Sequence, residues 1–201
     1  MKKNEIINNF VSYRNYTITN NCHVKPTKGV NSGNAGRTAE LAVKLALNNY
    51  RGAKGVTGAT RKDTFKTLDG IVTSFEIKSG CGVLANIDEN GNYYGTMLKS
   101  EYVIYIPEYN PLLPVTIQAY VLLVQDFIEI LQEVGLIRLK MSGAQYNNGQ
   151  RKEGAFYDRL TIQTFNNSKK KTAQLYDALN RYADTMEDFF NRYDVTINKQ
   201  F

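Results

Sequence analysis

Two carboxylates and a lysine stand close together in the chain, at Asp69, Glu76 and Lys78. Carboxylate oxygens are the ligands that a hard divalent cation such as Mg²⁺ prefers. A cation bound in this way polarises a phosphoryl oxygen and lowers the pKa of bound water, and a nearby lysine can stabilise the charge that develops. We therefore predict a metal site with Asp69 and Glu76 as ligands, Lys78 as the catalytic lysine, and hydrolysis of phosphodiester bonds as the reaction.

The three side chains can meet only if the backbone turns between Asp69 and Glu76. Glu76 and Lys78 are two residues apart, so a β-strand would place both on one face. On one continuous strand, Asp69 would lie on the opposite face and more than about 20 Å from Glu76. A hairpin that turns at Thr73-Ser74 would bring all three side chains to one side of a sheet. The metal hypothesis therefore predicts a hairpin at Thr73-Ser74.

Two other interpretations of this segment stay open. Asp69-Gly70 is itself a turn signal, and a hairpin at that point would break the arrangement of the three residues. Glu76 and Lys78 could also form the exposed face of an amphipathic edge strand, with the apolar residues beside them forming its buried face.

The spacing resembles the signature of the PD-(D/E)XK nuclease superfamily, which includes many restriction endonucleases and phage or repair nucleases. Asp69 is followed by six residues and then by Glu76, one apolar residue and Lys78, while a leucine stands in the place of the motif's proline. The superfamily often carries a glutamate on the helix that precedes the catalytic hairpin, and Glu40 matches that position. The resemblance implies an Mg²⁺- or Mn²⁺-dependent deoxyribonuclease in which Glu40 is an accessory catalytic residue.

The elements that must position these residues can be read from the periodicity of the sequence. Residues 37–50 have the apolar spacing of a helix, and on it Glu40 could simply form an ion pair with Lys44 one turn later. Residues 65–79 and 101–106 are rich in β-branched and aromatic side chains, which favours strands. The helix, the hairpin and the second strand would form a nuclease core at about residues 36–106.

The rest of the chain predicts further helices and strands. We expect helices at about residues 5–13, 115–134 and 171–193, and strands at 136–141 and 158–165. The fold class that follows is α/β or α+β, with a restriction-endonuclease-like mixed β-sheet flanked by helices in a single domain over residues 1–201. The helical C-terminal region, at about residues 115–201, is a candidate for dimerisation or DNA recognition.

The composition favours an anionic partner. The formal net charge is +6 and the sequence pI is about 9.2, which raises the local concentration of polyanions. The glycine-containing loop between the first helix of the core and its hairpin carries four cations, which we predict to contact the DNA backbone: Arg51, Lys54, Arg61 and Lys62. Cleavage of a duplex at a defined site usually takes two active sites, which predicts a homodimer.

The sequence also predicts the cellular compartment of the protein. Cys22 and Cys81 form no disulfide framework, the N-terminal residues are polar, and no stretch is apolar enough to span a membrane. A cytoplasmic location is therefore expected. A second hypothesis explains the same positive charge without catalysis: a nucleic-acid-binding or phage accessory protein, on a nuclease-like scaffold or on none.

Overall fold

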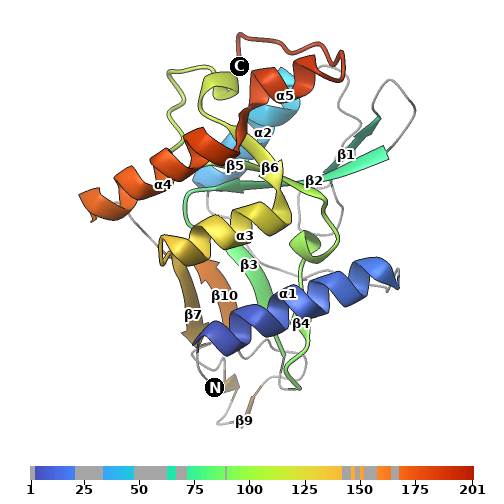
Figure 1. Cartoon of the computed structure of the whole chain (residues 1–201), viewed down its shortest axis with the longest axis vertical. Helices are drawn as coiled ribbons and strands as arrows, with labels where there is room; N and C mark the ends of the chain where they lie inside the picture. The colour runs from blue at the N-terminus through green and yellow to red at the C-terminus, as the bar shows by residue number, and fades with distance from the viewer. Residues whose placement is uncertain are drawn as a thin grey trace.

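The computed structural model has two β-sheets with helices packed against them (Figure 1). The structure describes residues 3–20, 34–47, 63–66, 72–88, 90–141, 146–147, 150–151, 158–163 and 168–201. The helices are α1 (Lys3–Thr19), α2 (Asn34–Ala46), α3 (Val124–Glu133), α4 (Lys169–Tyr182) and α5 (Met186–Asn191), with short 3-10 helices η1 (Thr96–Leu98) and η2 (Val115–Ile117).

The first sheet has five strands in the order β1-β2-β5-β6-β11. These strands are β1 (Asp63–Lys66), β2 (Val72–Ser79), β5 (Tyr102–Ile106), β6 (Tyr120–Leu123) and β11 (Asp184–Thr185). The sheet is mixed, because β2 runs parallel to β5 while the other neighbours are antiparallel. Apolar residues of α2 and α5 pack with Phe75, Ile104 and Ile106 on one of its faces.

The second sheet is antiparallel and has the strand order β4-β3-β10-β7. Its strands are β4 (Tyr93–Tyr94), β3 (Val83–Ile87), β10 (Asp158–Ile162) and β7 (Ile137–Met141), and a separate ribbon joins β8 (Tyr146–Asn147) to β9 (Gln150–Arg151).

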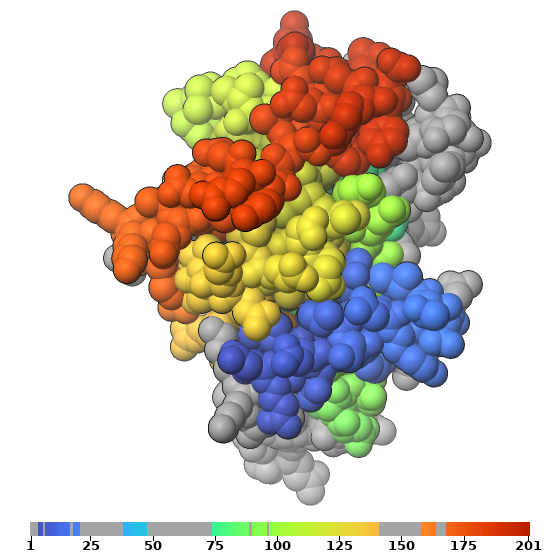
Figure 2. Space-filling model, in the orientation of Figure 1, coloured from blue at the N-terminus to red at the C-terminus, as the bar shows by residue number. Residues whose placement is uncertain are grey.

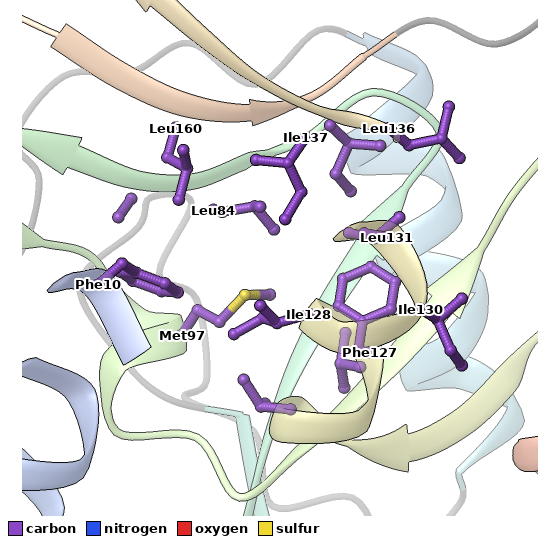
Figure 3. Packing of buried hydrophobic residues seen from close by; sticks show 14 of the residues in the cluster. Phe10, Leu84, Met97, Phe127, Ile128, Ile130, Leu131, Leu136, Ile137 and Leu160 are labelled. Carbon is purple, nitrogen blue, oxygen red and sulfur yellow. The ribbon is translucent and has the colours of Figure 1, made fainter. Parts of the chain in front are cut away.

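A large apolar core lies between the two sheets and around α3. Phe127, Ile128 and Leu131 of α3 pack there with Leu84 of β3 and Leu160 of β10 (Figure 3). Helix α1 closes this core through Ile7 and Phe10, and Figure 2 shows it beside α3 on one face of the molecule. Burial of these side chains is the main favourable contribution to folding.

Much of the predicted architecture is confirmed. The fold is mixed α/β, and a mixed sheet is flanked by helices, as we expected. Strands β5, β7 and β10 lie at the predicted positions, and α2 covers most of the predicted helix at 37–50. Helix α1 extends beyond residues 5–13 at both ends. No helix in the described ranges is long and apolar enough to span a membrane.

The prediction of one helix over residues 115–134 is wrong in its first half. The segment forms η2 and then β6, and only the second half is α3. An apolar run does not by itself distinguish a buried strand from a buried helix. Here Tyr120–Leu123 pairs with β5 on one side, and its first two residues pair with β11 on the other, so strand pairing decides the outcome.

The predicted helix over residues 171–193 is also interrupted. Helix α4 ends at Tyr182, β11 pairs with β6, and α5 then begins at Met186. Thr185 caps α5, because its side chain accepts a hydrogen bond from the backbone N–H of Asp188. A threonine three residues before an acidic residue is a helix-start signal, so the second helix could have been found in the sequence.

Candidate active site

Glu76 and Lys78 lie on β2, an interior strand of the first sheet. In register they stand beside Val103 and Tyr105 of β5, which belong to the core around α3. The predicted placement of Glu76 and Lys78 on one face of a strand is confirmed by their contact: Lys78 Nζ donates a hydrogen bond to Glu76 Oε1 at 2.5 Å.

This ion pair is largely shielded from water. The exposed fraction of the side chain is 12% for Glu76 and 17% for Lys78. The interpretation of the two residues as an exposed face is therefore wrong, since both side chains are mostly covered. The described pairing of β1 with β2 ends at Phe75, so β5 is the described neighbour of β2 at Glu76 and Lys78. Burying two charges is costly unless their contact is close and well bonded.

The turn after β2 is shaped around the Lys78 side chain. A Cβ atom at Gly82 would lie 3.0 Å from Lys78 Cδ, so the glycine leaves room for the lysine stem. Tyr105 donates a hydrogen bond from its hydroxyl to the carbonyl of Gly80 at 3.3 Å. Gly80 has a φ of +53°, which a residue with a Cβ rarely adopts. Burial raises the pKa of the Tyr105 phenol, so this group stays a neutral donor beside Lys78.

The hairpin lies earlier in the chain than we predicted. β2 runs without interruption through Thr73 and Ser74, and these two residues pair with Phe65 and Thr64 of β1. The connection between the strands is therefore residues 67–71, and the predicted turn at Thr73-Ser74 is wrong. Thr-Ser lacks the left-handed preference of a tight hairpin turn, and the β-branched and aromatic residues around it favour an extended backbone.

This correction removes the geometric argument for Asp69. Asp69 falls within the connection and outside the described residues. Val72 pairs with Lys66 at the end of the hairpin, and Glu76 lies four residues further, about 13 Å along the strand. A tight hairpin no longer brings Asp69 and Glu76 together, and the role of Asp69 as a ligand stays a prediction.

The corrected register also places an acid that sequence reasoning did not consider. Asp63 is the first residue of β1, and its backbone stands opposite that of Phe75, so its position belongs to the Phe75 face of the sheet and not to the face of Glu76. The turn signal of the Asp69-Gly70 sequence could have predicted this register. If a hairpin turns about Asp69, residues at equal distances in sequence before and after it pair with each other. Asp63 is six residues before Asp69 and Phe75 is six residues after it, so the two become partners.

The structure does not bring Glu40 to the ion pair. Glu40 is on α2, where its carboxylate forms an ion pair with Lys44. Helix α2 packs against the Phe75 face of the first sheet, whereas Glu76 lies on the other face. The structure therefore contains the simple helical ion pair of Glu40 with Lys44.

The described part of the chain supplies one carboxylate to a possible metal site. No three His, Cys, Asp or Glu side chains gather there to hold a metal ion. The oxygen of Glu76 has the right donor chemistry for Mg²⁺ or Mn²⁺, and the second carboxylate that the sequence predicts, Asp69, lies outside the described residues. Arg51, Lys54, Arg61 and Lys62, which we predicted to contact DNA, lie outside the described residues.

No protein-family model matches the chain, and neither a curated protein nor a solved structure matches it. The functional argument therefore depends on the chemistry of Glu76 and Lys78. Their arrangement offers a carboxylate that can bind a hard cation and, 2.5 Å away, an ammonium group that can donate to an anionic substrate.

Proposed function

We propose that the protein is a metal-dependent deoxyribonuclease of restriction-endonuclease-like fold, with Mg²⁺ or Mn²⁺ as its cofactor. The observation that carries the proposal is the shielded contact of Glu76 with Lys78, on one face of an interior strand. The positive net charge of +6 supports an anionic substrate such as DNA.

Burial makes a purely structural role for the pair expensive. Replacing a buried ion pair with apolar residues of similar volume is often neutral or stabilising. The neighbours of the pair on this face, Val103 and Tyr105, belong to an apolar core that could accommodate such residues. Retention of two charges there supports a chemical role.

The chain's own groups have distinct parts in this mechanism. Glu76, with a second acid from the hairpin, would hold the cation, which supplies polarisation of the phosphoryl group and a more acidic water. Lys78 donates hydrogen bonds and positive charge towards the phosphate, where negative charge grows as the bond to the leaving oxygen breaks. The buried side chains of Val103 and Tyr105 limit the access of water to Lys78, and the lower local polarity strengthens the electrostatic effect of the lysine.

The proposal is tested by incubating supercoiled plasmid and single-stranded DNA with the protein in Mg²⁺ or Mn²⁺, with EDTA as a control. We expect cleavage that EDTA abolishes and that Lys78→Ala and Glu76→Gln reduce by at least about 100-fold. Lys199→Ala is the matched control, because Lys199 forms an ion pair with Glu187 and its side chain is 67% exposed. Binding without cleavage in every metal would leave the non-catalytic nucleic-acid-binding protein instead.

The second carboxylate is identified by a paired comparison in the same assay. Asp63→Asn and Asp69→Asn each remove one charge from the hairpin and keep the side-chain shape. We expect Asp69→Asn to abolish metal-dependent cleavage and Asp63→Asn to have a small effect, because the register places Asp63 on the Phe75 face, away from Glu76. Loss at Asp69 alone would support the ligand predicted from the sequence. Full activity in Asp69→Asn would contradict it.

A further inference from the structure

The second sheet has an outward face that the proposed active site does not use. On β10, Leu160 and Ile162 enter the apolar core, so the alternation of a strand directs Arg159 outward. On β7, Ile137 is in the core and Leu139 packs against it, which likewise directs Arg138 and Lys140 outward. We call Arg138, Lys140 and Arg159 the basic strip.

The basic strip has an arrangement that folding alone does not favour. Lys140 stands directly opposite Arg159 in the β7–β10 register, and like charges in that position repel. The acidic residue of the three strands β3, β10 and β7 is Asp158, which alternates with Arg159 and so shares the face of Leu160. Within these described strands, the outward face therefore carries positive charge without a carboxylate to balance it.

A second, independent observation concerns the buried end of the strip. Asn86 of β3 is the register partner of Arg159 and is only 2% exposed. In the described part of the chain, Asn86 Oδ1 and Arg159 Nε are buried without a hydrogen-bond partner. Buried polar atoms are normally satisfied, and one that is not indicates a missing partner such as a bound ligand.

The strip begins close to the proposed active site. Lys78 borders Gly82, whose carbonyl accepts a hydrogen bond from the backbone N–H of Ile162 on β10 at 2.9 Å. The next pair along the two strands is Val83 with Thr161, and Asn86 lies three residues further, about 10 Å along β3. These strands therefore border Lys78 on their core-facing side, beside Ile162, and carry the basic strip on their opposite face.

We propose that the basic strip and Asn86 bind the sugar-phosphate backbone of the DNA that is cleaved at Glu76 and Lys78, an inference that rests on the proposed function. Arg138 and Lys140 are exposed on the edge strand β7, where their positions are about 7 Å apart, a spacing that suits successive phosphates. The planar guanidinium of Arg159 suits a phosphate that comes close to Asn86.

The test measures DNA binding by the full chain in EDTA, so that binding is separated from cleavage. The probes are a fluorescently labelled DNA duplex and its single strand, titrated at several salt concentrations. The strip variant is Arg138→Gln with Lys140→Gln. The matched control is Arg181→Gln with Lys199→Gln, which removes the same charge from two exposed positions outside the second sheet.

We expect the strip variant to bind duplex at least about tenfold more weakly near 0.1 M salt. The slope of log association constant against log salt concentration should become less steep by about two. The control should bind almost like the wild type. Equal loss in both variants would show a general charge effect and overturn the inference, as would unchanged binding in the strip variant.

The outcome for the strip differs from the outcome for the nuclease. Plasmid that stays intact in every metal, together with a specific loss of binding in the strip variant, would overturn the nuclease and leave a DNA-binding surface. Cleavage that needs Lys78, together with unchanged binding in the strip variant, would support the nuclease and overturn the strip. Both substituted residues are exposed, and an unchanged thermal unfolding curve confirms that the variant is folded.

Discussion

The two faces of β2 have opposite chemistry. On one face, Phe75 is fully buried, and its ring centroid lies 5.5 Å from that of Tyr102 and 5.7 Å from that of Phe190. On the other face, Glu76 and Lys78 form a shielded ion pair within the same span of strand. Aromatic packing contributes directly to stability. For two buried charges, the cost of removing them from water offsets most of the energy gained from their attraction.

The two faces therefore have different roles: the Phe75 face stabilises the fold, and the other face positions Glu76 and Lys78. The Phe75 face joins the first sheet to α2 and α5, so changes there should act on stability. The Glu76 face presents two charges beside an apolar core, so a change that removes both charges together should act mainly on chemistry. The experiments below either separate the two faces in this way or show that the distinction is wrong.

The largest effect on stability is expected from Phe75→Ala. The substitution removes a buried ring from an aromatic cluster and leaves a cavity, which costs about 3 to 5 kcal/mol in the free energy of unfolding. For a chain of this length that corresponds to a melting temperature lower by roughly 6 to 20 °C. Thermal unfolding followed by circular dichroism measures it.

The matched control for Phe75→Ala is Leu112→Ala, because Leu112 is 88% exposed. Its truncation should change the unfolding free energy by less than about 0.5 kcal/mol. A similarly small change for Phe75→Ala would mean that this face of β2 is not a packed core.

A smaller net effect on stability is expected from replacing both members of the ion pair. Glu76→Leu alone or Lys78→Leu alone leaves one buried charge without its partner and should cost about 3 kcal/mol. The double variant removes both charges and should recover to within about 1 kcal/mol of the wild type. Urea unfolding of the four proteins gives the coupling energy of the pair.

The same double variant separates stability from chemistry. Although it should fold nearly as well as the wild type, we expect it to cleave no DNA. The exposed pair of Glu187 and Lys199 provides the control, and its double-mutant cycle should give a coupling below about 1 kcal/mol. Additive losses at Glu76 and Lys78 would show that their contact contributes nothing specific.

The placement of Glu76 and Lys78 on one face could be predicted because it depends only on the two-residue period of a strand. The same is true of Phe75, which the alternation assigns to the opposite, buried face. The position of the hairpin required a choice between two possible turns, and the spacing of the nuclease signature favoured the wrong one. Asp69-Gly70 has the better turn chemistry and stands, in the sequence, between the end of β1 and the start of β2.

Other parts of the fold depend on contacts between distant segments. Residues 120–123 form a strand because β5 lies on one side of them, and β11 from near the end of the chain lies on the other. No pattern within residues 120–123 indicates that β5 and β11 will lie beside them. The basic strip and its neighbour Asn86 are similar, since Asn86, Lys140 and Arg159 meet only after three separate strands have paired. Sequence reasoning could not have assembled it.

The smallest effect concerns the tyrosines on the two faces at alkaline pH. Burial raises the pKa of Tyr105, on the Glu76 face. For Tyr102, on the Phe75 face, burial and the charges of nearby groups raise the pKa to about 12. In the unfolded chain both phenols ionise near pH 10. Below that pH both states keep the proton and stability is unaffected. Above it the unfolded state loses protons first, so the unfolding free energy falls as pH rises.

Tyr105→Phe should therefore flatten the loss of stability above about pH 10, by at most about 1.4 kcal/mol per pH unit. The variant keeps the ring that packs 4.8 Å from Phe127 and loses only a long hydrogen bond to Gly80. Urea unfolding between about pH 8 and 11 measures the slope, with Tyr102→Phe as the counterpart on the other face. If Tyr105→Phe loses stability as steeply as the wild type, then the phenol ionises normally in the native state. Water would then reach Tyr105 beside Lys78, and the argument that exclusion of water strengthens the lysine's electrostatic effect would fail.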